Sequence, residues 1–100
     1  MDRDRFAAHI EANRERYYDE LCALLRQPSI AAQGIGLTET AEIVLRRLEH
    51  LGAEVQVLRL PGAVPVVYGL LGSGDRTLLI YDHYDVQPPE PLAGWTTQWS

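Results

Sequence analysis

The first quarter of the chain carries apolar residues at helical spacing. Between Phe6 and Leu25 they recur every three or four residues in a segment otherwise rich in Arg, Glu and Asp, a pattern typical of an amphipathic helix. Pro28 follows, and the residue before a proline is disfavoured in helical conformation. The pattern therefore predicts one helix from about residue 4 to about residue 26.

A second helix is predicted after residues 29–37, a loop with two glycines and no apolar periodicity. Thr38 can cap the start of this helix. Gly52 can follow its end, because glycine adopts the left-handed backbone common there. Its apolar stripe consists of Ala41, Val44, Leu45, Leu48 and Leu51.

Three strands are predicted next. Residues 54–60 alternate apolar and polar side chains, which indicates a half-exposed, edge-like strand. Residues 64–71 are apolar on both faces. Residues 76–81 are the third strand, and their run Leu78-Leu79-Ile80-Tyr81 is apolar on both faces, as a covered interior strand is. Turns are expected at Pro61-Gly62 and over residues 72–75, so that the last two strands would form a hairpin. The fold class is α/β, with two helices followed by three strands.

Length and composition predict one small soluble domain over residues 1–100. The chain is 46% hydrophobic and 23% charged, and its net charge of -5 argues against a nucleic-acid partner. Cys22 is the single cysteine, so an intrachain disulfide is excluded. No signal peptide or membrane-spanning stretch is predicted, and a cytoplasmic location is expected.

Candidate chemistry is concentrated in residues 82–85, where the third predicted strand ends. Ligands in open α/β sheets bind just outside the carboxyl ends of the strands. His83 and Asp85 are two residues apart, and in extended backbone such residues point to the same side. They could be a metal-binding imidazole and the carboxylate that orients it. A histidine hydrogen-bonded at a strand end remains the alternative, because a His-x-Asp triplet is a weak pattern.

Other titratable residues are interpreted structurally. Asp82 and Tyr84 would face away from His83, the first as a solvated carboxylate and the second as a packing residue. His9 and His50 are expected at the surface of the two helices. Cys22, beside the apolar stripe of the first helix, is interpreted as a packing residue, and Gly72-Ser73-Gly74 as a turn.

The block Leu78-Leu79-Ile80-Tyr81-Asp82-His83-Tyr84-Asp85-Val86-Gln87-Pro88, with Trp95-Thr96 following, resembles the first metal-ligand motif of the dinuclear-zinc exopeptidase family. That family includes carnosine-type dipeptidases, glutamate carboxypeptidases, succinyl-diaminopimelate desuccinylase and aminoacylases. The continuation Tyr84-Asp85-Val86-Gln87-Pro88 is most similar to the dipeptidase branch. The resemblance runs from about Arg5 to Thr97. Asp82 stands where the family usually has a small or neutral residue, and the ending Gln98-Trp99-Ser100 also departs from the family pattern.

The resemblance implies a role for two residues. His83 matches a zinc ligand, and Asp85 matches the catalytic-site carboxylate that orients it. The family uses two zinc ions to hydrolyse a peptide or amide bond, so the implied substrate is a peptide or N-acyl amino acid. The resemblance also implies a homodimer for a full-length protein.

The remaining ligands and the general base of the family have no counterpart in this sequence. The chain is therefore interpreted as an N-terminal fragment of the catalytic domain, without the dimerisation domain and inactive by itself. The alternative is a noncatalytic soluble remnant or interaction module that binds no metal.

Overall fold

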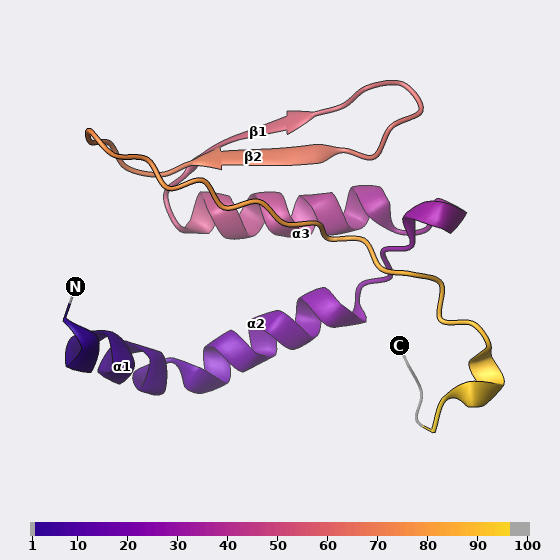
Figure 1. The fold of residues 1–100 in the computed structure, drawn as a ribbon, viewed down its shortest axis with the longest axis horizontal. Helices are drawn as coiled ribbons and strands as arrows, with labels where there is room; N and C mark the ends of the chain where they lie inside the picture. The colour runs from indigo at the N-terminus through magenta and orange to yellow at the C-terminus, as the bar shows by residue number, and fades with distance from the viewer. Residues whose placement is uncertain (1, 97–100) are drawn as a thin grey trace.

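The computed structural model describes residues 2–96 and combines helices with a small antiparallel sheet (Figure 1). The predicted mixture of helix and strand is confirmed. Thr97 and Trp99, which belong to the C-terminal part of the resemblance and tail, lie outside the described residues. The elements are α1 (Arg3–Ala12), α2 (Arg14–Arg26), the short 3-10 helix η1 (Ala31–Gln33), α3 (Leu37–His50), β1 (Glu54–Leu58), β2 (Val66–Leu70) and the 3-10 helix η2 (Leu92–Gly94).

The first predicted helix is two helices that meet at Asn13, so the prediction of one continuous helix was wrong. The backbone of Asn13 leaves the helical region, at φ -114° and ψ 11°. Its side-chain Nδ2 donates to the carbonyl oxygen of His9 at 2.9 Å. The side chain of asparagine can hydrogen-bond to nearby backbone groups and so compete with the hydrogen bonds of a regular helix, which explains the break here. The start of α1 is capped by the carboxylate of Asp2, which accepts from the N–H groups of Asp4 and Arg5.

Glycines precede and follow α3. Gly36, at φ +73°, precedes its first residue, so the predicted cap at Thr38 was wrong. The hydroxyl of Thr40, one turn in, donates to the carbonyl oxygen of Gly36 at 2.7 Å. The prediction for Gly52 is confirmed: it has φ +90°, and its N–H donates to the carbonyl oxygen of Glu49 at 2.9 Å. The next N–H, of Ala53, donates to Leu48 at 3.1 Å, which completes a Schellman motif.

The sheet is a hairpin of β1 and β2, and α3 packs against both strands. Its register pairs Glu54 with Leu70 and Leu58 with Val66. Exposed and half-buried residues alternate along β1, as its sequence pattern predicts. The turn at Pro61-Gly62 is also confirmed. The hairpin is thus formed by the first two predicted strands and not by the last two, because two strands joined by a short loop pair readily.

The third predicted strand does not form in the described part of the chain. Residues 76–81 have no regular secondary structure, and a bend at Gly74 and Asp75 precedes them. Figure 1 shows this segment, in orange, leaving the end of β2 and crossing in front of α3. A strand exists only when its backbone pairs with another strand, and these residues have no such partner here. Residues 78–81 are 80–88% exposed, and residues 2–96 supply no layer that covers them.

The packing is open. The fully buried residues of the described chain are Ser29, Ile30, Thr40 and Ala41, where the loop before η1 meets the first turn of α3. The chain exposes 8805 Å², whereas a compact monomer of this mass exposes about 5,700 Å². Its radius of gyration is 16.6 Å, against about 13 Å for a compact domain of this length.

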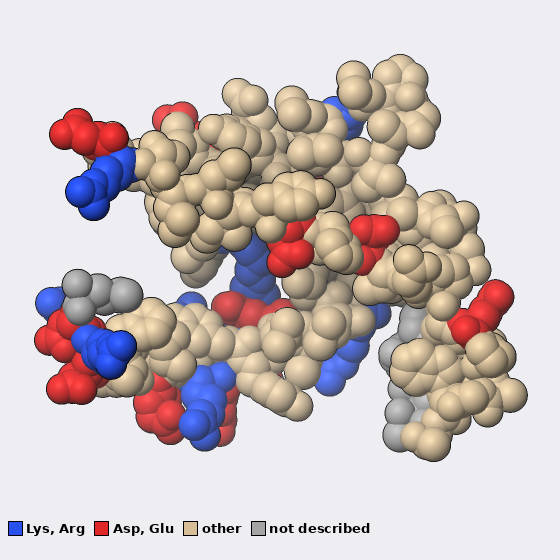
Figure 2. Space-filling model, viewed as in Figure 1, with Lys and Arg blue, Asp and Glu red and all other residues tan. Residues whose placement is uncertain are grey.

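The arm made of α1 and α2 stands away from α3, and Figure 2 shows the gap between them. An ion pair between Glu20 and Arg47, at 3.1 Å, crosses from α2 to α3. Both side chains are substantially exposed, so this pair stabilises the contact only weakly. Among the described residues, no helix is long and apolar enough to cross a membrane.

Candidate functional site

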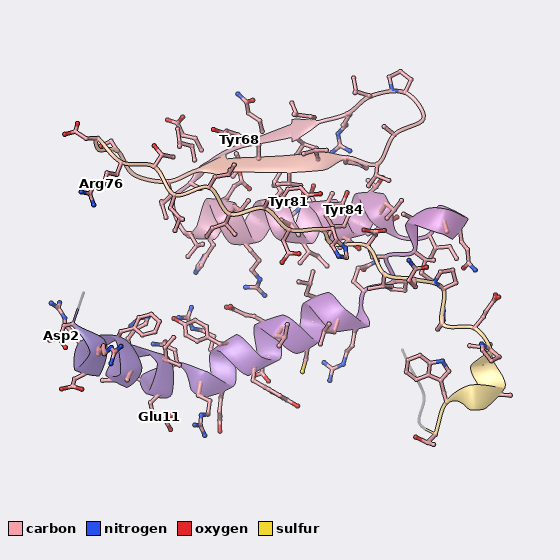
Figure 3. All side chains as sticks on the ribbon, in the orientation of Figure 1. Asp2, Glu11, Tyr68, Arg76, Tyr81 and Tyr84 are labelled. Carbon is pink, nitrogen blue, oxygen red and sulfur yellow. The ribbon has the colours of Figure 1, made fainter. Side chains whose placement is uncertain are left out.

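The segment that carries the candidate residues is attached to the rest of the fold at two points. The hydroxyl of Tyr84 donates to the carbonyl oxygen of Pro65, just before β2. The N–H of Val86 donates to the carbonyl oxygen of Ser29 at 2.7 Å, beside the small core. Figure 3 shows Tyr84 where the segment passes the start of α3. These contacts fix the backbone on either side of Asp85, and no local sequence pattern could have indicated them.

His83 and Asp85 contact each other as their spacing suggests. His83 Nδ1 lies 3.1 Å from Asp85 Oδ1 and 3.0 Å from the backbone oxygen of Asp85. Both partners are acceptors, so Nδ1 carries the proton and donates. In the neutral imidazole, the other nitrogen, Nε2, then keeps its lone pair. A carboxylate that orients a metal-binding histidine makes the same kind of contact with its ring.

The pair is open to solvent. The side chain of His83 is 71% exposed and that of Asp85 is 42% exposed. Asp82 is also exposed, and its carboxylate accepts from the N–H of His83 at 2.8 Å. Asp82 therefore turns back on the backbone of its neighbour. The prediction that it points to the opposite face depended on a strand that residues 76–82 do not form.

The other two histidines and the cysteine lie on the helices. His9 is exposed on α1, with Nε2 2.8 Å from the hydroxyl oxygen of Tyr17, and His50 is exposed in the last turn of α3. Both are surface residues, as predicted. Cys22 is half-buried on α2. Within residues 2–96, no three His, Cys, Asp or Glu side chains are grouped to hold a metal ion.

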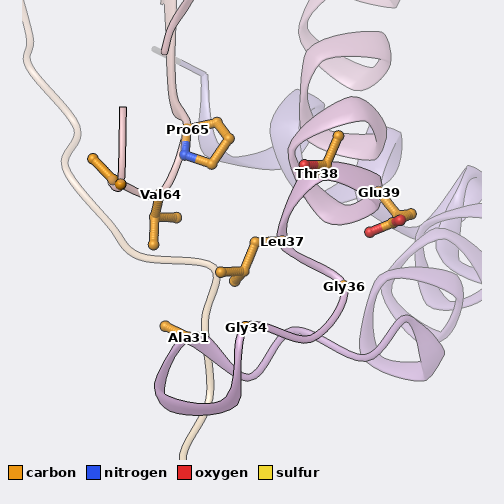
Figure 4. A pocket seen from close by; sticks show the side chains of 10 residues that line it. Ala31, Gly34, Gly36, Leu37, Thr38, Glu39, Val64 and Pro65 are labelled. Carbon is orange, nitrogen blue, oxygen red and sulfur yellow. The ribbon is translucent and has the colours of Figure 1, made fainter. Parts of the chain in front are cut away.

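A shallow hollow of about 390 Å³ lies between the start of α3 and the loop before β2 (Figure 4). Glu39 is the titratable side chain in its lining, and the rest is backbone, small or aliphatic groups and the hydroxyl of Thr38. His83 and Asp85 do not line it. The hollow therefore offers no arrangement of ligands that would complete a metal site around His83.

The pKa of Tyr84 is raised above its ordinary value of 10.0. Burial is the main cause, because it disfavours the charged phenolate; the negative charge of Asp85 adds to it, and Arg59 acts in the opposite direction. The folded chain thus keeps this proton to a higher pH than the unfolded chain does. Its contribution to stability is complete below about pH 10 and is lost as pH rises through the folded-state pKa.

Tyr84→Phe should remove this alkaline dependence. We expect the variant to lose about 0.5–1.5 kcal/mol near neutral pH, because the hydrogen bond to Pro65 is gone. Above about pH 10 the difference from the unmodified chain should shrink. Urea unfolding across this pH range measures both effects, with Tyr81→Phe, at a residue 88% exposed, as the control. A gap between Tyr84→Phe and the unmodified chain that stays constant with pH would contradict this reading.

Comparison with known proteins gives distant matches to hydrolases. No protein-family model matches the chain, and no solved structure matches it. Succinyl-diaminopimelate desuccinylase of Xylella fastidiosa strain M12 is 30% identical over 80 residues, covering 80% of this chain and 20% of the relative. The strain M23 protein is 33% identical over 79 residues, covering 79% of this chain and 20% of the relative.

The Cys-Gly metallodipeptidase dug1 of Schizosaccharomyces pombe is 28% identical over 114 aligned positions, covering 97% of this chain and 23% of the relative. The chain is a distant relative of desuccinylases and metallodipeptidases. By their names, these relatives are a desuccinylase and a metallodipeptidase. The chain spans only about a fifth of the length of these relatives.

Proposed function

We propose that this chain is the N-terminal part of the catalytic domain of a zinc-dependent, dipeptidase-like hydrolase of peptide or amide bonds. The observation that carries the proposal is the pairing of His83 with Asp85. It places Nδ1 3.1 Å from Asp85 Oδ1, on an imidazole side chain that is 71% exposed. The similarity to a desuccinylase and a metallodipeptidase supports the same reading.

In this proposal His83 holds one zinc ion through Nε2, and Asp85 is the residue of the catalytic site that fixes the orientation and tautomer of the imidazole. A carboxylate partner also makes the imidazole a better donor to the metal. When bound, zinc polarises the scissile carbonyl and makes a water molecule more acidic. The substrate would be a peptide or an N-acyl amino acid, and the complete enzyme would hold two zinc ions and form a homodimer.

A catalytic zinc ion requires about three protein ligands. Residues 2–96 present one histidine nitrogen suited to this role and no grouped set of three. We propose that the missing ligands belong to the part of the relatives that this chain does not match. The open packing is consistent with this view, because 8805 Å² of exposed surface is what part of a larger domain would leave uncovered.

A second candidate function is a noncatalytic interaction module that binds no metal. The observation that favours it is the uncovered apolar run over residues 78–81, which is 80–88% exposed. Large exposed apolar patches on a protein surface often mark sites of protein–protein interaction. The two candidates differ in whether His83 binds zinc once the rest of a catalytic domain is present.

The isolated chain of 100 residues is expected not to hydrolyse dipeptides, even with zinc added. One imidazole cannot hold zinc as a catalytic site does, and no general base accompanies it. The assay is release of free amino acids from dipeptides by the purified chain, with and without zinc, beside the His83→Ala variant. Turnover that requires zinc and disappears in His83→Ala would overturn the ligand argument.

A further inference from the structure

The segment of residues 76–82 contains a continuous apolar run, residues 78–81, that the described residues leave uncovered. Leu78, Leu79, Ile80 and Tyr81 are 80–88% exposed. None of the backbone hydrogen bonds found among residues 2–96 joins the N–H or C=O groups of residues 76–81 to another part of the chain. Figure 3 shows the segment between its labelled residues Arg76 and Tyr81, outside the sheet.

Such a segment is suited to pairing with another strand. Uncovered strands associate with other chains through their unpaired backbone N–H and C=O groups and their exposed apolar side chains. Ile, Tyr and Thr favour strands, and three of the seven residues are of these types: Thr77, Ile80 and Tyr81. Figure 2 shows few charged side chains on the surrounding upper part of this face, so little charge repulsion opposes an approach there.

The charges at the two ends of the segment select the partner. Arg76 and Asp82 are each three residues from Leu79. If two copies pair antiparallel with Leu79 opposite Leu79, each Arg76 lies opposite Asp82 of the other copy. The same register places Leu78 opposite Ile80. Neither Arg76 nor Asp82 makes an ion pair with another side chain in the described part of the chain, so both charges are available.

Other arrangements lack this complementarity. In a parallel in-register pair, Arg76 would lie opposite Arg76 and Asp82 opposite Asp82, and like charges directly opposite are destabilising. A shift of one residue toward the N-terminus would place Asp82 opposite Asp75. The antiparallel pair centred on Leu79 is also symmetric about a two-fold axis, which limits assembly through this edge to a dimer.

We infer that residues 76–82 form an intermolecular antiparallel strand pair with a second copy of this chain, in the register that places Arg76 opposite Asp82. The partner is thus the chain itself, recognised by backbone hydrogen bonds, apolar side chains and two symmetric charge pairs. This association requires no metal and no substrate. It applies to the 100-residue chain by itself, because the remaining segments of a complete catalytic domain, as proposed above, would cover residues 76–82.

Charge exchange tests the partner and the direction of pairing. Sedimentation equilibrium of the full chain should show a dimer at about 100 µM. Arg76→Asp should raise the dissociation constant about tenfold or more, because it creates two repulsive pairs. The double variant Arg76→Asp with Asp82→Arg should restore dimerisation, since the charges are exchanged but stay opposite. Arg3→Asp, which makes the same change of charge on exposed α1, is the matched control and should have little effect.

Cross-linking tests the register. With Cys22→Ser as the background, Leu79→Cys should form an intermolecular disulfide, because residues directly opposite lie about 4.5–5.5 Å apart at Cα. Tyr81→Cys should not, since the two copies of residue 81 would be about 13 Å apart along the strand. A chain that stays monomeric at about 100 µM, a double charge variant that is no better than Arg76→Asp, or equal cross-linking at both positions would overturn the inference.

Discussion

Replacing Gly36 with alanine is expected to unfold the chain or cost more than about 3 kcal/mol of stability. Gly36 has φ +73°, a backbone conformation that costs an alanine about 1–2 kcal/mol. An added Cβ would also lie 1.8 Å from the carbonyl oxygen of Pro28 and 2.7 Å from its carbonyl carbon. Both are backbone atoms, so the clash can be relieved only by moving the loop. That loop leads directly into Ser29 and Ile30, half of the small core.

Gly34→Ala separates the two causes of this effect. Gly34 also has a left-handed backbone, at φ +66°, but nothing lies within 4 Å of the position of an added Cβ. We expect it to lose only the conformational cost of about 1–2 kcal/mol. Urea unfolding followed by circular dichroism compares both variants with the unmodified chain. Equal losses would show that the contact with Pro28 contributes nothing.

The second large effect concerns hydrolysis in a longer protein, made by joining this chain to the remaining four-fifths of the Xylella fastidiosa desuccinylase. If the proposed function is correct, His83→Ala in this protein should abolish nearly all zinc-dependent turnover, because a ligand of the metal is lost. Asp85→Ala should leave the fold intact and reduce activity or metal affinity by roughly 10–100-fold, the usual cost of removing the carboxylate behind a histidine ligand. The measurement is turnover of N-acyl amino acid and dipeptide substrates over a range of zinc concentrations.

Asp82→Gly is the matched control for the Asp85 variant. It also removes one carboxylate beside His83, but Asp82 accepts from the backbone N–H and not from the imidazole. Its effect on turnover should therefore be the smallest of the three. If Asp82→Gly proved as damaging as His83→Ala, Asp82 would itself be a ligand, and the roles given to Asp82, His83 and Asp85 would have to be abandoned.

Features with local causes could be predicted from the sequence. Gly52 was identified as the left-handed residue just beyond the end of α3, because the turn there depends only on glycine and the preceding helix. The alternation of β1 likewise indicated its exposed and half-buried sides. The break at Asn13 was missed, since its hydrogen bond to the carbonyl oxygen of His9 competes with a helix pattern that is otherwise continuous.

Features that depend on distant residues could not be predicted in this way. Residues 76–81 have the composition of a covered strand, but pairing and covering must come from other segments, and residues 2–96 supply none. The contact of His83 with Asp85 was expected from their spacing, although its cause is different: the imidazole turns toward the carboxylate without a strand. The attachments of Tyr84 to Pro65 and of Val86 to Ser29 join residues far apart in the sequence and left no local signal.

The most direct test of the central claim is the zinc content of the longer protein with and without His83, measured by elemental analysis after circular dichroism has confirmed that both are folded. The proposed function predicts that His83→Ala lowers the zinc content by about one ion per chain. His50→Ala, which removes an exposed histidine from α3, should leave it unchanged. An unchanged zinc content in the folded His83→Ala protein would contradict the claim that His83 is a metal ligand.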